Sequence, residues 1–145
     1  MMNSTGNSTR AGSEGPVKLK NDLRALVVDD NRVNRKLLMT MLSWAKVNAH
    51  EVENGKEAVE LHLSGKNFHV IFIDMEMPIM DGPQATKILR SMGVRTWIVG
   101  VSGNCRDSDR RDFLAAGIDD FHVKPLSRQK FVEILHKVDD EISNN

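Results

Sequence analysis

Three short apolar runs, each followed by a polar or charged residue, constrain the fold of this chain more than any other feature. The clearest run covers residues 70–73 and ends at Asp74, and the first covers 25–28 and ends at Asp29 and Asp30. Runs that are apolar at every position, rather than at alternate ones, are typical of strands covered on both faces. The third run covers 97–101 and ends at Ser102, and two further strands with interspersed polar residues are predicted over about 47–52 and 118–123.

Between these runs, apolar residues recur at the spacing of a helix face. This pattern predicts helices over about 32–45, 56–64, 82–92, 107–116 and 128–142. Gly117 is a plausible C-cap glycine, and Ser127 is placed to cap the last helix. Strands and helices that alternate in this way predict the α/β class, with a doubly wound five-stranded parallel sheet.

The composition describes an ordinary globular domain with polar ends. Residues 1–20 are rich in Ser, Thr, Asn and Gly, so we expect a flexible N-terminal tail followed by one domain over 21–145. Twenty basic and 20 acidic residues give a net charge of +0, which predicts no nucleic acid and no membrane surface as partner. A single cysteine, Cys105, excludes an internal disulfide, and no apolar run approaches transmembrane length, which indicates an intracellular protein.

Polar residues of three kinds follow the predicted strands. They are Asp29, Asp30, Asp74, Ser102 and Lys124. Because the carboxyl ends of parallel strands meet at one edge of the sheet, we expect these side chains to converge. Three carboxylates that lie close together need a cation, and hard oxygen ligands suit Mg²⁺ better than zinc. A carboxylate can also accept a phosphoryl group, and a lysine and a hydroxyl can contact its oxygens.

Four stretches resemble the receiver domain of the two-component response-regulator family. They are LVVDDNRVNRKLL, VIFIDMEMPIMDG, IVGVSG and DDFHVKP, and the likeness runs from about Arg24 to Val138. The resemblance implies a flavodoxin-like receiver fold with strand order 2-1-3-4-5. It also implies that Asp74 is phosphorylated by a phosphohistidine. The protein would then switch an interaction surface or act as a phosphate sink.

The resemblance assigns a role to each residue that matches the family motifs. Catalysis falls to Asp74, Lys124 and Ser102. The ligands of Mg²⁺, or of Mn²⁺, are Asp29, Asp30, Asp74 and Glu76, with Asp29 acting through water and Glu76 through its backbone carbonyl. Ser102 and Phe121 form the switch, in which Ser102 moves toward the phosphoryl group and Phe121 rotates inward. The Lys124–Pro125 peptide is expected to be cis.

The implied partner is a histidine-containing phosphotransfer protein or a histidine kinase. It would dock near the first helix and the rim loops, with Val33, Leu37 and the Pro125–Leu126 segment as candidate contacts. The chain most resembles plant single-domain regulators of type C, or receivers of hybrid kinases, which implies cytokinin signalling, a cytoplasmic or nuclear location and a monomer. One departure is His122, which stands where the family usually has an apolar residue.

Two other functions compete with this interpretation. One is a small phosphohydrolase that uses Asp74 as a covalent nucleophile, like the haloacid-dehalogenase-type phosphatases. Those enzymes keep a general-acid aspartate two residues after the nucleophile, where this chain has Glu76. The other is a pseudo-receiver that acts by protein contact alone, which the complete set of pocket residues argues against. We expect no enzymatic activity beyond self-catalysed phosphorylation and dephosphorylation.

Overall fold

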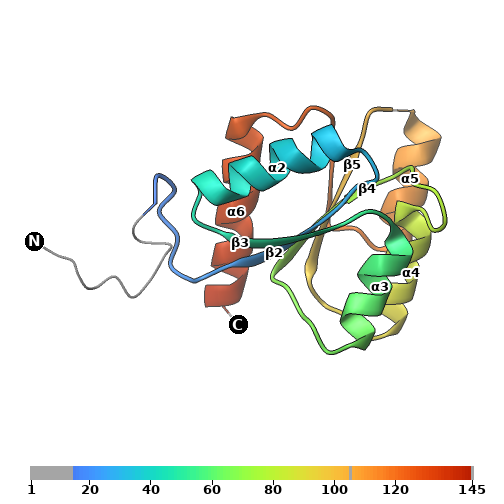
Figure 1. Cartoon of the computed structure of the whole chain (residues 1–145), viewed down its shortest axis with the longest axis horizontal. Coiled ribbons are helices and arrows are strands. Elements are labelled where there is room, and N and C mark those ends of the chain that lie inside the picture. Colours follow the sequence, from blue (N-terminus) through green and yellow to red (C-terminus); the bar gives the residue numbers. More distant parts are fainter. Residues whose placement is uncertain (1–14, 105, 145) are drawn as a thin grey trace, which may run out of the picture.

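The five predicted strands form one parallel sheet in the computed structural model, which describes residues 15–104 and 106–144 (Figure 1). The strands are β2 (Arg24–Val28), β3 (Asn48–Val52), β4 (Val70–Asp74), β5 (Trp97–Ser102) and β6 (Asp120–Val123). Their order across the sheet is β3-β2-β4-β5-β6. When the strands are counted along the chain with β2 as the first, this is the predicted order 2-1-3-4-5, which is confirmed. Every residue of β4 is buried, as its continuously apolar sequence predicts, whereas the edge strand β3 has no buried residue.

Helices cover both faces of this sheet (Figure 1). They are α2 (Arg32–Trp44), α3 (Gly55–Leu63), α4 (Gly82–Ser91), α5 (Asp107–Ala116) and α6 (Arg128–Ser143). Residues of α2 and α6 pack in one apolar cluster on one face, and residues of α3, α4 and α5 pack in a second cluster on the other. Each face of the sheet is therefore withdrawn from water, which fixes the strand ends as the place where polar groups gather.

Local capping explains where several helices begin and end. The side chains of Asn31, Asn54, Asp81 and Ser127 each accept a hydrogen bond from a backbone N–H in the first turn of the following helix. At the end of α5, Gly117 has a φ of 119°, a left-handed conformation that favours glycine. Both predicted caps, Ser127 and Gly117, are confirmed.

The N-terminal segment before β2 differs from the prediction of a flexible tail over residues 1–20. Val17 and Leu19 are buried in the cluster beneath α2 and α6, and the backbone N–H groups of Lys20 and Asn21 donate to Asp139. The prediction is therefore wrong for residues 15–20, because two apolar side chains and one buried carboxylate attach this polar stretch to the domain. Residues 1–14 lie outside the described part of the chain.

The last strand is shorter than its apolar pattern indicates. We predicted a strand from residue 118, but β6 begins at Asp120. Asp119 lies in the preceding loop, where its carboxylate accepts the backbone N–H of Ile98 at 2.8 Å and pairs with Arg90.

Among the described residues, no helix is both long enough and apolar enough to cross a bilayer.

Candidate functional site

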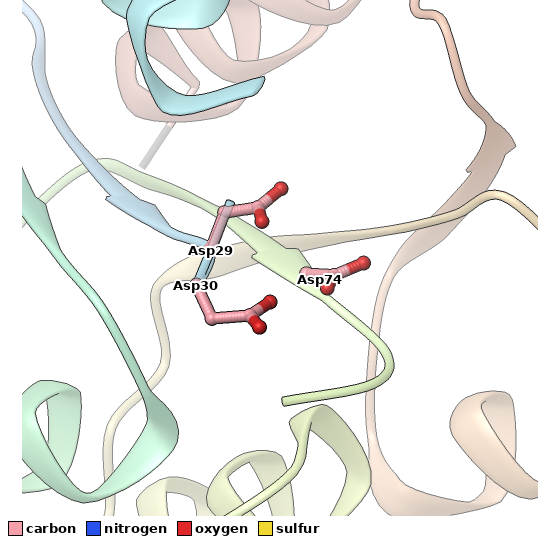
Figure 2. A group of neighbouring side chains, drawn as sticks. All are labelled: Asp29, Asp30 and Asp74. Atoms are coloured by element: carbon pink, nitrogen blue, oxygen red, sulfur yellow. The ribbon is translucent and has the colours of Figure 1, made fainter. Parts of the chain in front are cut away.

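Three aspartates meet at the carboxyl edge of the sheet (Figure 2). Asp29 and Asp30 directly follow β2, and Asp74 is the last residue of β4. The two strands pair in register, Val28 beside Ile73, so their ends lie next to each other. One carboxylate oxygen from each aspartate lies within 4.8 Å of the others. The predicted convergence of these three side chains is confirmed.

Asp29 is buried and fixed by its neighbours in the chain. Its Oδ1 accepts the backbone N–H of Asn31 at 2.8 Å, and its backbone carbonyl accepts a guanidinium N–H of Arg35 at 2.8 Å. Asn31 also caps α2, so one residue both starts the helix and orients the carboxylate. Sequence reasoning missed both residues. Asn31 carried a signal, since asparagine before a periodic segment is typical of an N-cap, but Arg35 carried none.

Lys124 forms an ion pair with each of two aspartates of the trio. It follows β6, and its Nζ lies 2.9 Å from Asp29 Oδ2 and 2.9 Å from Asp74 Oδ1. Burial acts to lower the pKa of Lys124, but hydrogen bonds and charge attraction from Asp29 and Asp74 outweigh it and raise the pKa. Lys124 therefore remains an ammonium group at neutral pH. The Lys124–Pro125 peptide is cis, as predicted.

The surroundings of Asp74 compensate its negative charge only in part. Burial, followed by the charges of Asp29 and Asp30, raises its pKa to about 6 against the opposing effect of Lys124. The residue is 6% exposed, so water provides little of the missing solvation. A single ammonium shared between two carboxylates thus leaves room for a further cation at this edge of the sheet.

The donor set fits a hard divalent ion. The three carboxylates supply oxygen ligands, and Glu76 and Asp30 line the same open cavity of about 410 Å³ beside them. Asp30 and Glu76 are exposed, which leaves space for water in a coordination sphere. The nearby Met75 and Met77 are buried in the apolar cluster under α3, α4 and α5, so their sulfur atoms serve packing rather than metal binding.

The two predicted switch residues lie on the neighbouring strands β5 and β6: Ser102 ends β5, and Phe121 lies within β6 beside Gly100. Ser102 is buried, and its Oγ accepts the backbone N–H of Asn104 at 3.0 Å. Phe121 is also buried: its ring packs edge-on against Phe113 at 6.3 Å, and the Arg110 guanidinium lies 5.6 Å from its centre. The ring therefore lies in the inward position that we predict for the switched state. Phenylalanine has no hydroxyl that would favour an outward position.

His122, which departs from the family pattern, has the polar partner that its position requires. Its Nε2 lies 3.0 Å from the carboxylate of Asp120, two residues earlier on β6. Lys137 on α6 lies 3.8 Å from the same carboxylate. The Asp120 carboxylate therefore accommodates this polar side chain on the edge strand β6.

Comparisons with known proteins agree with this geometry. The response regulator receiver domain family matches residues 25–136. Two-component response regulator 24 of Arabidopsis thaliana is 42% identical over 129 residues, which cover 89% of this chain and 93% of that protein. Two-component response regulator ORR41 of rice, Oryza sativa subsp. japonica, is 39% identical and covers 79% of this chain and 93% of its own length.

A solved structure connects the family to the metal. The receiver domain of the Pseudomonas aeruginosa sensor histidine kinase PA1611, determined with a magnesium ion coordinated in its active site cleft, superposes with a TM-score of 0.75. The two chains are 29% identical, and the match covers 82% of this chain and 98% of the other. Receiver domains bind Mg²⁺ at an acidic pocket of the kind formed here. The chain belongs to the response regulator receiver domain family and is a receiver domain of the phosphorelay type.

Proposed function

We propose that Asp74 accepts a phosphoryl group from a phosphohistidine, and that this chain thereby acts as a phosphorelay switch or phosphate sink. The observation that carries the proposal is the surrounding of Asp74: a buried carboxylate between two further aspartates, with the Lys124 ammonium at 2.9 Å. A carboxylate held in this way is a nucleophile whose incoming phosphoryl group meets a fixed positive charge. We infer no turnover of an external substrate, so the chain is not an enzyme in the usual sense.

The transfer is a displacement at phosphorus. The bond from phosphorus to the donor imidazole nitrogen breaks as a bond to a carboxylate oxygen of Asp74 forms, and the imidazole keeps the electron pair. Lys124 Nζ, already beside Asp74, would bind an equatorial oxygen of the phosphoryl group. Ser102, which follows Val101 opposite Asp74 in the sheet, would donate its hydroxyl to another oxygen.

Mg²⁺, or Mn²⁺ in its place, would be bound by Asp29, Asp30 and Asp74, with the backbone carbonyl of Glu76 as a further ligand. The ion supplies positive charge against the phosphoryl oxygens. Asp30 is the exposed member of the trio, which supports direct ligation by Asp30, whereas both carboxylate oxygens of Asp29 already accept N–H donors. This difference agrees with a role for Asp29 through water.

The structural change that signals phosphorylation would arise around β5 and β6, which carry Ser102 and Phe121. When Ser102 moves toward the phosphoryl group, its hydrogen bond from Asn104 is lost and the β5–α5 loop must rearrange. The contact between Phe121 and Phe113 supports an inward position of the Phe121 ring in the phosphorylated form, in which the space left by Ser102 admits the ring.

The partner would dock beside α2. Two large apolar side chains of this helix are exposed, Val33 at 67% and Leu37 at 56%. A groove of about 390 Å³ runs from Leu37 along Pro125 and Leu126 to Asp29 and Lys124. An apolar surface that leads directly into the acidic pocket suits a protein donor, namely a histidine-containing phosphotransfer protein or the histidine kinase itself, which binds a monomer of this chain.

The test is labelling with acetyl phosphate and then with a phosphorylated histidine phosphotransfer protein from Arabidopsis thaliana. We expect Mg²⁺-dependent incorporation of one phosphoryl group with both donors, and loss of labelling in Asp74→Asn. The matched control is Asp139→Asn, which changes a buried aspartate outside the site. Labelling that persists in Asp74→Asn, or that ignores chelation of the metal, would contradict the proposal.

A further inference from the structure

A partly buried asparagine with an unpaired side-chain amide lies beside the aspartate pocket. Asn34 stands in the first turn of α2, and its backbone N–H donates to the Asn31 side chain at 3.0 Å. Among the residues that the structure describes, none forms a hydrogen bond with the side-chain amide of Asn34. The residue is only partly exposed. An amide that can both accept and donate hydrogen bonds is therefore available to a ligand.

The position of Asn34 connects the apolar groove beside α2 to the reacting groups. Asn34, Leu38 and Met41 recur at helical spacing along α2. All three line the groove of about 390 Å³ whose other walls include Asp29 and Lys124. Of the three, Asn34 is nearest to the start of α2, which follows the aspartates closely in the chain. The stripe that faces the groove is thus apolar except at the end that meets the pocket.

The same groove reaches the strand beside the phosphoacceptor. Val101 lines the groove, and it is the register partner of Asp74 in the β4–β5 pair. Lys124, on another wall, has its Nζ 2.9 Å from Asp74 Oδ1. A donor side chain that enters along α2 therefore has the Asn34 amide on one wall of the groove and the groups that receive the phosphoryl group on another.

A phosphohistidine donor carries a second ring nitrogen, whose protonation decides how well the ring leaves. When the bond between phosphorus and nitrogen breaks, that nitrogen keeps the electron pair and phosphorus bonds to an oxygen of Asp74. A ring with a proton on its other nitrogen then leaves as neutral imidazole, whereas a ring without that proton leaves as an anion. A hydrogen-bond acceptor at this N–H stabilises the protonated, reactive form and fixes the orientation of the ring.

We propose that the side-chain oxygen of Asn34 accepts a hydrogen bond from the donor imidazole, at the ring nitrogen that is not bonded to phosphorus, and so orients the phosphohistidine for transfer to Asp74. The inference rests on the proposed function and adds a donor-binding residue to it. The contact acts on the ring itself, not on the surface of the donor protein. An amide suits this task, because it accepts a hydrogen bond without adding a fourth negative charge beside three carboxylates.

Four phosphodonors separate the parts of this proposal. They are the phosphorylated Arabidopsis thaliana phosphotransfer protein, phosphoimidazole, phosphoramidate and acetyl phosphate. Phosphoramidate has a phosphorus–nitrogen bond but no ring, and acetyl phosphate has neither. The variant is Asn34→Leu, which removes the amide at similar volume. Leucine forms helices better than asparagine and continues the apolar stripe, so α2 should be retained.

The rate of labelling is measured with each donor at the same pH and Mg²⁺ concentration. We expect Asn34→Leu to be labelled about five-fold more slowly by phosphoimidazole and by the phosphotransfer protein, which is the effect of losing one neutral hydrogen bond. Phosphoramidate and acetyl phosphate should label it at the unaltered rate, since neither contains an imidazole N–H. The matched control is Asn48→Leu, the same change at an exposed position at the start of β3, which should keep the unaltered rate with all four donors.

Three results would overturn this inference and leave the phosphoacceptor role in place. An unaltered rate of labelling of Asn34→Leu by phosphoimidazole would show that the amide does not bind the ring. A loss confined to the phosphotransfer protein would make Asn34 a docking contact only. An equal loss with all four donors would indicate a distorted pocket. If no donor labels the unaltered chain, the proposed function itself fails, and the inference fails with it.

Discussion

Two buried aspartates at opposite parts of the molecule show how a carboxylate can be either structural or reactive. Asp139 on α6 is 1% exposed, and it accepts the backbone N–H groups of Lys20 and Asn21 at 2.6 and 3.0 Å and the Asn21 amide at 2.7 Å. Asp74 is 6% exposed, but it faces two like charges and shares one ammonium with Asp29. Burial alone therefore does not distinguish the two. The difference lies in how well the surroundings compensate the charge.

The comparison explains why only one of these sites is suited to chemistry. Three N–H donors solvate the Asp139 carboxylate in place of water, so its negative charge is compensated. These hydrogen bonds attach the N-terminal segment to the domain. Asp74 has a pKa raised to about 6, so its ionised form is less stable than that of an ordinary carboxylate. The free energy that this arrangement costs is recovered when a divalent cation binds, which couples the site to its ligand.

The largest stability effect is expected at the structural carboxylate. Asp139→Ala leaves the N–H donors of Lys20 and Asn21 facing a buried site without an acceptor, which should lower the free energy of unfolding by about 3 kcal/mol. Urea denaturation at pH 7.5 measures this loss. Asp139→Asn keeps one acceptor oxygen and should lose less. An alanine variant as stable as the unaltered chain would show that the hydrogen bonds from Lys20 and Asn21 to Asp139 contribute nothing to the stability of the fold.

The same segment marks a limit of sequence reasoning. The strand ends and the convergence of Asp29, Asp30 and Asp74 followed from apolar runs and from the rule that parallel strands end at one edge, whereas the roles proposed for them came from the family resemblance. Nothing comparable signalled that Val17 and Leu19 pack into the core, because two apolar residues in a polar stretch form no period. Their burial depends on a partner more than a hundred residues away, on α6.

The switch region shows a second limit, since a residue's type does not fix its rotamer. The sequence placed Phe121 in the last strand, but its neighbours Phe113 and Arg110 on α5 could not be identified from any pattern in the sequence. Arg35 was missed for a similar reason. Its contacts to Asp29 and Glu51 arise only when α2 crosses the end of β3.

A smaller effect of opposite sign is expected at the reactive carboxylate. Asp74→Asn removes a charge that the metal-free site compensates poorly, so it should raise the free energy of unfolding by about 2 kcal/mol at pH 7.5. Because folding raises the pKa of Asp74 above its ordinary value of 3.8, to about 6, its ionisation destabilises the fold only as the pH rises. The gain should be absent below about pH 3.8, grow between pH 3.8 and pH 6, and be complete above pH 6.

Magnesium provides the control for this variant. Saturating Mg²⁺ should stabilise the unaltered chain, by about 2.7 kcal/mol at 100 times the dissociation constant, and should stabilise Asp74→Asn less. The advantage of the variant should therefore shrink or reverse when the ion is added. Denaturation curves of both proteins at pH 7.5, with Mg²⁺ and with a chelator, test this. A variant that is less stable than the unaltered chain in chelator would mean that Lys124 already compensates Asp74 in full.

The smallest effect tests whether poorly compensated ionisation is confined to the aspartate edge of the sheet. At the opposite edge, His69 Nδ1 accepts the backbone N–H of Arg24 at 2.9 Å, and partial burial followed by the Arg24 charge lowers the pKa of His69. A lowered histidine pKa means that the stabilisation is present above pH 6.5 and is lost as the pH falls below it. His69→Gln, whose amide oxygen can accept the same hydrogen bond, should remove this loss, which amounts to less than about 1 kcal/mol. Comparing both proteins at pH 7.5 and pH 5.5, by the difference in free energy of unfolding, isolates the histidine from the other groups that titrate there. A larger loss than at Asp74 would mean that the aspartate edge is not the main source of pH dependence, and the contrast between a reactive and a structural edge would fail.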